Sequence, residues 1–424
     1  MKKWLIALAC TSVMVTGCAS SNPSEEEVKG IGGTLKVVTG RTDAEELFEK
    51  IEADFKVLYP EVTDIIWESS ADYSNHITTR MNTTDYGDVL IIPFSMSGEP
   101  ELYPNYFEPL GTVEELSKDY IDVTEADYEG VSYGLPTAIN SLGIVYNEDV
   151  FEAAGIASFP TSVEEFLEAC KKIKENTDAV PFFTNYSGVA IWGGALTSFA
   201  GEKYKADTLE KGTAFEEGQP MREVMDLFYN LALNGYTEED PVTMDSAQGK
   251  QMIADGKIAM MMTGSQDVRP ISELSGNTAT IKIAPFPVLL EGKTTIAFGA
   301  PEVMGINVNS ENKETARAFL DFFISADSKY ADDLGGMSPA KADFTPEEKE
   351  LFENSNIVLT AGSEEPETDA LYNSIANEVG VARLTDVLQQ AINMGLYPDQ
   401  YESYEEYVSQ LENKWAQAVS EYAK

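Results

Sequence analysis

The residue types that carry most enzyme chemistry are scarce in this chain of 424 residues. His76, the only histidine, stands on a polar helical stretch, which argues against its use in a catalytic triad, and one histidine cannot make a histidine-rich zinc site. The chain also has no GxxxxGKS sequence, the phosphate-binding loop of many nucleotide-hydrolysing enzymes. Its 72 aspartates and glutamates leave one route open, because a glycosidase needs only two carboxylates. The residues therefore argue against histidine-based catalysis and do not exclude glycan hydrolysis.

The three cysteines are Cys10, Cys18 and Cys170. The first two lie in or beside an N-terminal leader, so no disulfide is expected within the mature chain. Cys170 stands among apolar residues at helical spacing, which favours a buried, unreactive thiol over a nucleophile. Stability must therefore come from buried side chains, and a mature chain of about 400 residues is long enough for two domains.

Residues 1–17 have the composition of a secretory leader. A basic start precedes an apolar stretch, residues 4–15, that is too short to span a bilayer. The Val-Thr-Gly-Cys ending resembles the bacterial lipobox, which implies cleavage before Cys18 and acylation of its thiol. The alternative is ordinary secretion with a free Cys18. Residues 18–33, rich in Ser, Glu and Gly, are predicted to be a solvated tether.

The chain carries a formal net charge of −43, from 72 acidic and 29 basic side chains. A field of this sign repels phosphate backbones, so nucleic acid is excluded as a partner. The acidic runs at residues 25–27 and 364–365 lack the regular spacing of a calcium loop and are interpreted as solvated surface. No metal or other cofactor is expected.

Polar and aromatic side chains stand at the ends of three predicted strands in the first part of the chain. The strands, residues 35–38, 65–67 and 88–92, alternate with two helices, the first of which begins at a capping box formed by Thr42 and Glu45. This alternation predicts an α/β fold with a parallel sheet and helices on both faces. Ligands of such sheets bind beyond the carboxyl ends of the strands. The candidate binding residues at these ends are Thr39, Arg41, Trp67 and Ser95.

The stretch from Tyr133 to Phe151 joins the two halves of the chain. Pro136 fixes its own backbone angle and favours an extended path, so residues 137–140 are predicted to be a crossover that leads into a buried strand. A second crossover is predicted at residues 297–301, where Gly299 would supply an unusual backbone angle.

The hinge pattern, YGLPTAINSLGIVYNEDVF, resembles family 1 extracellular solute-binding proteins of ABC importers, the maltose-binding-like group. Two further stretches carry the resemblance: residues 248–266, a helix, Gly-Lys, an apolar strand and a Gly turn, and residues 309–325. The resemblance implies a two-lobe, periplasmic-binding-protein-like fold of type II, with a cleft between two lobes that are each a sheet flanked by helices. It also argues against the glycosidase. Residues 34–137 plus 285–328 are expected to form the first lobe, and residues 138–284 plus 329–424 the second.

Two sets of large side chains are assigned to the core. The three methionines 260–262 lie in a predicted buried strand, which favours packing over a metal or hydrophobic-ligand site. Trp415 shares one stripe of the last helix with Leu411 and is interpreted in the same way.

The resemblance also places ligand contacts. A sugar site needs aromatic faces for the apolar side of the ring and planar polar groups for the hydroxyls. Asn140 matches a position that often hydrogen-bonds sugar, Trp192 matches an aromatic platform, and Gln266 stands where the family usually has a tryptophan. The remaining candidates border the expected cleft: Tyr186, Gly299 and Met337.

Arg41 leaves two interpretations open. A guanidinium at the end of the first strand can bind a carboxylate through two hydrogen bonds, which would suit an acidic sugar. In so acidic a protein it can also pair with a neighbouring carboxylate of its own chain.

The function that these expectations imply is capture of a mono- or oligosaccharide between the lobes and its delivery to an ABC permease. The protein would be a monomer, held by its lipid on the outer face of the bacterial cytoplasmic membrane. Two alternatives remain: the same fold with a non-sugar ligand such as a polyamine, which would need convergent carboxylates, and a secreted glycan hydrolase.

Overall fold

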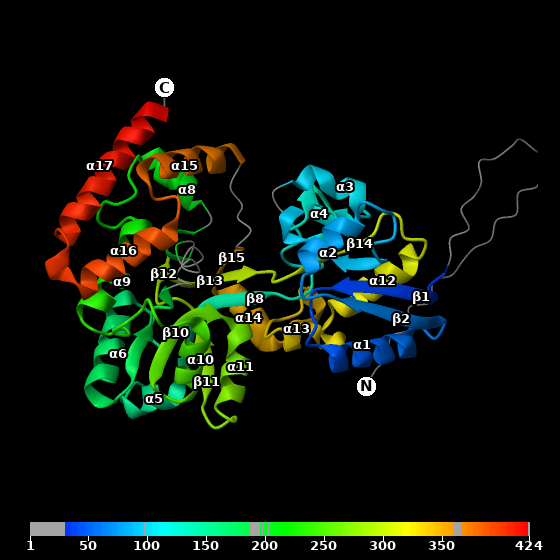
Figure 1. Cartoon of the computed structure of the whole chain (residues 1–424), viewed down its shortest axis with the longest axis horizontal. Helices are drawn as coiled ribbons and strands as arrows, with labels where there is room; N and C mark the ends of the chain where they lie inside the picture. Colours follow the sequence, from blue (N-terminus) through cyan, green and yellow to red (C-terminus); the bar gives the residue numbers. More distant parts are fainter. Residues whose placement is uncertain are drawn as a thin grey trace, which may run out of the picture.

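The computed structural model of the protein describes residues 30–96, 99–186, 196, 198–201, 203–359 and 366–422. They form two lobes joined by a narrow waist, with a five-stranded sheet in one lobe and a seven-stranded sheet in the other (Figure 1). The leader, most of the tether and Cys18 lie outside the described residues. Across the described part of the chain, no helix combines the length and the apolar character needed to cross a membrane.

The sheet of the first lobe has the strand order β2-β1-β3-β14-β7. Strand β1 pairs in parallel with β2 and β3, whereas β14 runs antiparallel to β3 and β7. The strands are β1 (Gly33–Thr39), β2 (Val62–Ser69), β3 (Val89–Ile91), β7 (Leu135–Pro136) and β14 (Val303–Ile306). The predicted parallel β-α-β-α-β unit is confirmed, and one antiparallel strand from later in the chain extends it.

Alternate residues of β1 face opposite cores. Val37 packs with Phe55 of α1 (Glu45–Leu58) and Phe319 of α12 (Lys313–Phe323), whereas Val38 packs with Ile77 of α2 (Tyr73–Arg80). Helices therefore cover both faces, as a parallel sheet requires. The predicted capping box at the start of α1 is wrong, because Ala44 precedes the helix and makes no side-chain cap. A small antiparallel sheet of β4 (Gly111–Thr112), β5 (Asp127–Tyr128) and β6 (Val131–Ser132) and two short helices, α3 (Tyr103–Tyr106) and α4 (Val113–Leu116), complete this lobe.

The sheet of the second lobe is built around a long central strand, β8. Strands β10, β11 and β13 all pair antiparallel with it. The bounds are β8 (Asn140–Asn147), β9 (Val180–Phe183), β10 (Ile258–Gly264), β11 (Ile281–Ala284), β12 (Leu289–Leu290), β13 (Lys293–Gly299) and β15 (Asn356–Leu359). The three methionines 260–262 are fully or almost fully buried in β10, which confirms that they belong to the core.

Helices cover both faces of this sheet as well. Met260 packs into one core and Met261 into another, so the strand is buried on both sides. The larger core includes Cys170 and Trp415, both fully buried, as predicted. The helices are α5 (Glu148–Ala153), α6 (Val163–Asn176), α8 (Tyr204–Lys211), α9 (Pro220–Leu233), α10 (Ser246–Ala254), α11 (Val268–Leu274), α14 (Pro346–Asn354), α15 (Pro366–Val379), α16 (Leu384–Leu396) and α17 (Tyr404–Tyr422).

The chain crosses the waist at more than one point. It passes from β7 to β8 through residues 137–139, as predicted, and from β13 to β14 through residues 300–302. The expected division of lobes assigned residues 285–299 to the first lobe, but the pairing of β13 with β8 places them in the second sheet. The return at residue 285 is therefore wrong, because Pro285 leads into a hairpin of β12 and β13 and not into the waist.

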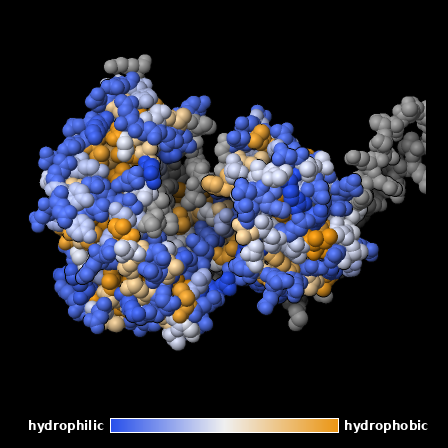
Figure 2. All heavy atoms as spheres, viewed as in Figure 1, coloured by the Kyte–Doolittle hydropathy of each residue, from blue (hydrophilic) through white to orange (hydrophobic). Residues whose placement is uncertain are grey.

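A further crossing follows α13 (Tyr330–Asp333), whose Tyr330 packs into the first-lobe core. Met337 then pairs with Ile139 through two backbone hydrogen bonds of 2.9 Å. The boundary expected at residue 329 accordingly falls a few residues early. Hydrophilic side chains cover most of the visible face, and the surface is hollowed between the two lobes above the waist (Figure 2).

Candidate functional site

Four of the residues predicted to bind ligand come together at the waist. Asn140 starts β8 and lies opposite Gly299, the last residue of β13. Its side-chain amide donates to Oε1 of Gln266 at 3.2 Å and to the carbonyl of Leu334 at 3.2 Å. Met337 is the fourth, through its pairing with Ile139. The predicted unusual backbone angle at Gly299 is not needed, because the residue is part of a regular strand.

Glycines allow this close approach. A Cβ atom on Gly336 would lie 2.2 Å from Oδ1 of Asn140, and one on Gly335 would lie 2.7 Å from Cα of Gln266. Gly335 also has a φ of +65°, which favours glycine. The Gly-Gly pair therefore fixes the distance between the crossing segment and the start of β8.

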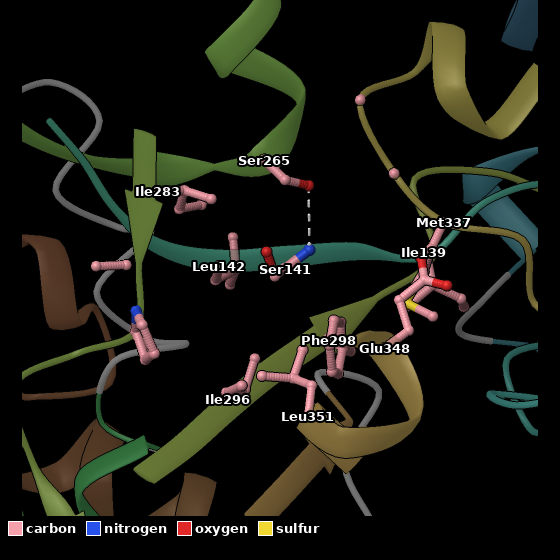
Figure 3. A pocket seen from close by; sticks show the side chains of 14 residues that line it. Ile139, Ser141, Leu142, Ser265, Ile283, Ile296, Phe298, Met337, Glu348 and Leu351 are labelled. Atoms are coloured by element: carbon pink, nitrogen blue, oxygen red, sulfur yellow. Dashed lines mark hydrogen bonds between the residues drawn. The ribbon is translucent and has the colours of Figure 1, made fainter. Parts of the chain in front are cut away.

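A cavity of about 300 Å³, here called the hinge pocket, is lined by Gly335, Gly336 and Met337 but by none of the other three candidates. Figure 3 shows Ser141 and Ser265 on one side, where Ser265 Oγ accepts from the backbone N–H of Ser141 at 3.3 Å. Apolar side chains of β8, β13 and α14 face it, among them Leu142, Phe298 and Leu351. The pocket is mostly apolar, so it offers few partners for a hydroxyl-rich ligand.

The candidates at the carboxyl ends of β1 and β2 are engaged within the protein. Thr39 is buried, and its hydroxyl accepts from the backbone N–H of Arg41 at 3.2 Å. Trp67 stacks on Phe48 with ring centroids 4.1 Å apart and an interplanar angle of 7°. Arg41 and Trp67 line another cavity of about 360 Å³, the edge pocket, together with Glu49. This arrangement favours a packing role for the Trp67 ring.

Arg41 is paired with carboxylates of its own chain, the second of the two interpretations. Its guanidinium donates to both oxygens of Asp43 at 3.1 Å, and Nη1 lies 2.8 Å from Oδ2 of Asp333. Burial by itself lowers the pKa of Arg41, but the hydrogen bonds to Asp43 and Asp333 outweigh it and raise the pKa above its usual value. The guanidinium also lies 5.6 Å from the centroid of the Tyr330 ring. A ligand carboxylate would have to displace these partners.

Asp333 joins the two lobes. Besides Arg41 of the first lobe, it binds Arg269 of α11, whose Nη2 donates to its carbonyl at 2.7 Å and to its Oδ1 at 3.1 Å. Since α11 packs in the second lobe, this is an ion pair across the waist.

Of the two aromatic candidates of the second lobe, only Tyr186 lies among the described residues. Tyr186 is tied to α16, because its hydroxyl accepts from Asn393 at 3.0 Å and its carbonyl accepts from Gln389 at 2.7 Å. Trp192 lies outside the described residues.

Sequence reasoning missed the largest of these cavities, about 720 Å³ beyond the carboxyl end of β3. Its lining includes the crossing segment 300–302, so this first-lobe pocket borders the waist. The rings of Tyr73, Phe94 and Tyr103 line it, and the Phe94 side chain is 87% exposed. Phe94 is the neighbour of Ser95, which is exposed beside the pocket. The pocket is lined by Phe94 and not by Ser95, whose role in binding stays a prediction.

Three carboxylates also line the first-lobe pocket: Glu125, Asp127 and Glu302. Burial raises the pKa of Glu125. Burial also raises the pKa of Glu302, although a hydrogen bond from the Tyr330 hydroxyl, 2.7 Å from Oε2, opposes the shift. No pattern in the sequence singles out these residues, because acidic side chains are common along the whole chain.

Two side chains that could serve as nucleophiles, Ser132 and Cys170, are buried. Residues 130–134 spell the GxSxG pattern of serine hydrolases, but Ser132 is fully buried in β6 and donates to the carbonyl of Gly134 at 2.7 Å. Burial raises the pKa of the Cys170 thiol far above its usual value, so a thiolate is disfavoured. No group of three or more metal-ligating side chains stands close enough to hold an ion in the part of the chain that the structure describes.

Comparison with known proteins gives a consistent result. The family model described as bacterial extracellular solute-binding protein matches residues 39–330. A diacetylchitobiose-binding protein of Streptomyces coelicolor is 30% identical over 96 residues, which are 21% of this chain and 23% of that protein.

Two solved structures from Bifidobacterium animalis subsp. lactis are similar over most of their length. One, a binding protein of an ABC transporter in complex with mannobiose, is 25% identical with a TM-score of 0.70 over 92% of this chain and 95% of that one. The other, a manno-oligosaccharide-specific solute-binding protein in complex with mannotriose, is 27% identical with a TM-score of 0.68 over the same shares. The two-lobe fold of type II is therefore the fold of this chain, and these relatives are binding proteins of transporters and not enzymes.

Proposed function

Since this chain belongs to the family of bacterial extracellular solute-binding proteins, we propose that it captures a mono- or oligosaccharide between its two lobes and delivers it to the permease of an ABC transporter. The likeness to binding proteins for manno-oligosaccharides and diacetylchitobiose supports the sugar as ligand class. The observation that carries the proposal within this chain is the first-lobe pocket, where exposed aromatic surface and hydrogen-bond acceptors stand side by side at the waist.

Each group in the pocket has a role that suits a sugar. The ring of Phe94 offers an apolar face to the C–H groups of a pyranose, and the carboxylates accept hydrogen bonds from hydroxyls. A site half built by one lobe becomes complete when the other lobe closes on the ligand. Binding then shifts the protein toward the closed arrangement, to the extent that the ligand prefers that arrangement.

The contribution of the second lobe remains a proposal. Trp192 is expected to cover the opposite face of the sugar, while Asn140 and Gln266 hold hydroxyls from the waist. Replacing Trp192 with alanine should weaken binding by about thirtyfold, the loss of a buried aromatic anchor, and leave the free energy of unfolding nearly unchanged. A loss of about 3–5 kcal/mol in stability with affinity intact would instead assign Trp192 to the core.

Calorimetric titration with mannobiose, mannotriose and diacetylchitobiose tests the main proposal. A ligand present at about 100 times its dissociation constant should also raise the free energy of unfolding by about 2.7 kcal/mol. Chromatography of the recovered ligand separates a carrier from a hydrolase, because a carrier returns the disaccharide intact. Spermidine serves as the polyamine probe, and its binding in place of any sugar would refute the proposal.

Anchoring is proposed separately, from the lipobox-like residues before Cys18. Acylation of Cys18 would hold the protein on the outer face of the cytoplasmic membrane, next to its permease, as a monomer. In a detergent partitioning experiment, the variant Cys18→Ala should be found in the aqueous phase. The variant Cys170→Ala should partition as the parent does. Equal partitioning of Cys18→Ala and the parent would show that no lipid is attached there.

A further inference from the structure

The charged side chains that line the first-lobe pocket are all acidic. Glu125 and Asp127 come from the segment before and within β5, and Glu302 comes from the crossing between the lobes. Among the described residues that line the pocket there is no lysine or arginine. A ligand that enters this pocket therefore meets acceptors and no positive charge.

The acceptors are held in place by neighbours. Oδ2 of Asp127 accepts from the backbone N–H of Gly130 at 3.1 Å. Oε2 of Glu302 accepts from the hydroxyl of Tyr330, which is fully buried. Because each carboxylate has about four acceptor positions, these contacts orient the group without using up its capacity for ligand hydroxyls.

Arg41, whose charge reaches Glu302, does not itself line the pocket. Arg41 binds Asp43 and Asp333 and lies against the ring of Tyr330, so Tyr330 stands between the guanidinium and Glu302. Asp122 adds a further buried acid: it is 4% exposed, and burial, followed by the charge of Glu125, raises its pKa. When these acidic groups are ionised, the electrostatic character of the site is therefore negative.

We propose that the first-lobe pocket selects uncharged, hydroxyl-rich glycans and rejects glycans of uronic acids, with Glu125, Asp127 and Glu302 accepting from sugar hydroxyls and Tyr330 acting as the positioning residue of Glu302. This inference rests on the proposed function and names the class of sugar. It also decides against the acidic ligand that an unpaired Arg41 would have suited.

The physical reason is that a carboxylate attracts a sugar hydroxyl, which is a hydrogen-bond donor, and repels a uronate, which carries a negative charge. A hydroxyl that donates to a carboxylate forms a charge-assisted hydrogen bond, which is about twice as strong as a neutral one. A uronate placed in the same position brings a like charge against several carboxylates in a partly desolvated site, and such juxtapositions cost enough to exclude a partner.

Matched pairs of disaccharides test this class assignment by calorimetry at pH 8. The probes are mannobiose with the corresponding mannuronate disaccharide, and galactobiose with the galacturonate disaccharide. Of any pair in which one member binds, the neutral sugar is expected to bind at least about thirtyfold more tightly.

Variants connect the discrimination to the residues. Glu302→Gln should reduce the ratio of the two affinities at least about fivefold, because one repelling charge is removed and the shape is kept. Tyr330→Phe removes only the hydroxyl. It should lower the affinity for the neutral sugar while leaving the edge pocket intact. Glu49→Gln, an exposed carboxylate of the edge pocket, is the matched control and should leave the ratio unchanged.

The outcomes distinguish failure of the charge selectivity from failure of the proposed function. A uronate that binds within threefold of its neutral partner, or a ratio that Glu302→Gln does not change, overturns the charge selectivity and leaves the proposed function standing. Binding of spermidine with no response to any disaccharide overturns the proposed function itself, and the charge selectivity with it. A Tyr330→Phe variant that alters neither affinity removes Tyr330 from its positioning role.

Discussion

Nδ2 of Asn140 lies 3.2 Å from Oε1 of Gln266, so two residues predicted to hold sugar hydroxyls are hydrogen-bonded to each other. Asn140 is almost fully buried at the start of β8, whereas Gln266 is exposed in the turn after β10. A ligand that uses Gln266 must therefore replace this contact, while Asn140 keeps its second bond to the carbonyl of Leu334. The pair connects the hinge to the wall of the second lobe.

The first prediction separates these two residues by stability. Asn140→Ala should lower the free energy of unfolding by about 1–3 kcal/mol, because it leaves the Leu334 carbonyl without its donor. Gln266→Ala should change it by less than about 0.5 kcal/mol, since the side chain is exposed. Denaturant unfolding measures both, and equal losses would contradict the difference in burial. If both residues bind ligand, both variants should also have a lower affinity for mannobiose, measured by calorimetry.

The second prediction concerns Arg41. Because its guanidinium binds Asp43 and Asp333 in a largely buried position, Arg41→Gln should lower the free energy of unfolding by about 1–3 kcal/mol. Its affinity for a neutral disaccharide should stay within threefold of the parent. Arg383→Gln, which removes an exposed arginine paired with Asp386, is the control and should be neutral in both measurements. A selective loss of ligand with unchanged stability would restore Arg41 as a binding residue.

The third prediction is a pH dependence that arises at Asp122. Burial, followed by the charge of Glu125, raises the pKa of Asp122 from 3.8 to about 7. The folded state therefore binds a proton more tightly than the unfolded chain, and stability decreases as the pH rises from about 4 to about 7. Asp122→Asn should remove this dependence and stabilise the protein above pH 7 by at most about 4 kcal/mol, with little effect at pH 4.

Asparagine suits this test because Asp122 has a φ of +58°, a conformation that asparagine tolerates well. Melting temperatures between pH 4 and pH 8 measure the effect. Asp119→Asn, an exposed site three residues earlier, is the control and should leave the pH profile of the parent unchanged. An Asp122→Asn profile parallel to that of the parent would show that Asp122 ionises without penalty.

The fourth prediction concerns the ion pair between Arg269 and Asp333 across the waist. The structure that contains this ion pair has a hollow between the lobes (Figure 2). Because the pair stabilises that arrangement, its loss should favour closure of the lobes. An exposed pair contributes about 0.2–1 kcal/mol, which predicts that Arg269→Gln binds its ligand about 1.5 to 5 times more tightly. Lys171→Gln, which removes an exposed pair within α6, is the control. Weaker binding by Arg269→Gln would assign the ion pair to the closed arrangement instead.

Residues close together in the chain explain what could be predicted. The strands, the helices and the buried positions of Cys170, Trp415 and the methionines of β10 follow from apolar periodicity, which is a local property. The crossover at residues 137–139 follows from Pro136, which restricts its own backbone and that of its neighbour. Where a prediction of this kind failed, as at the start of α1, a local pattern was present without the hydrogen bond that it usually makes.

The site depended on contacts between distant parts of the chain. Sequence order placed β13 in the first lobe, whereas its hydrogen bonds to β8 place it in the second. The acidic lining of the first-lobe pocket joins Glu125 to Glu302, and the cation that seemed available, Arg41, is bound by Asp333. The sequence by itself determined the elements, the family and the presence of candidate groups at strand ends, because short-range sterics and periodicity specify these features. Which groups face a ligand and which neutralise one another was decided by the tertiary structure, since charges and hydrogen bonds act through space between residues far apart in sequence.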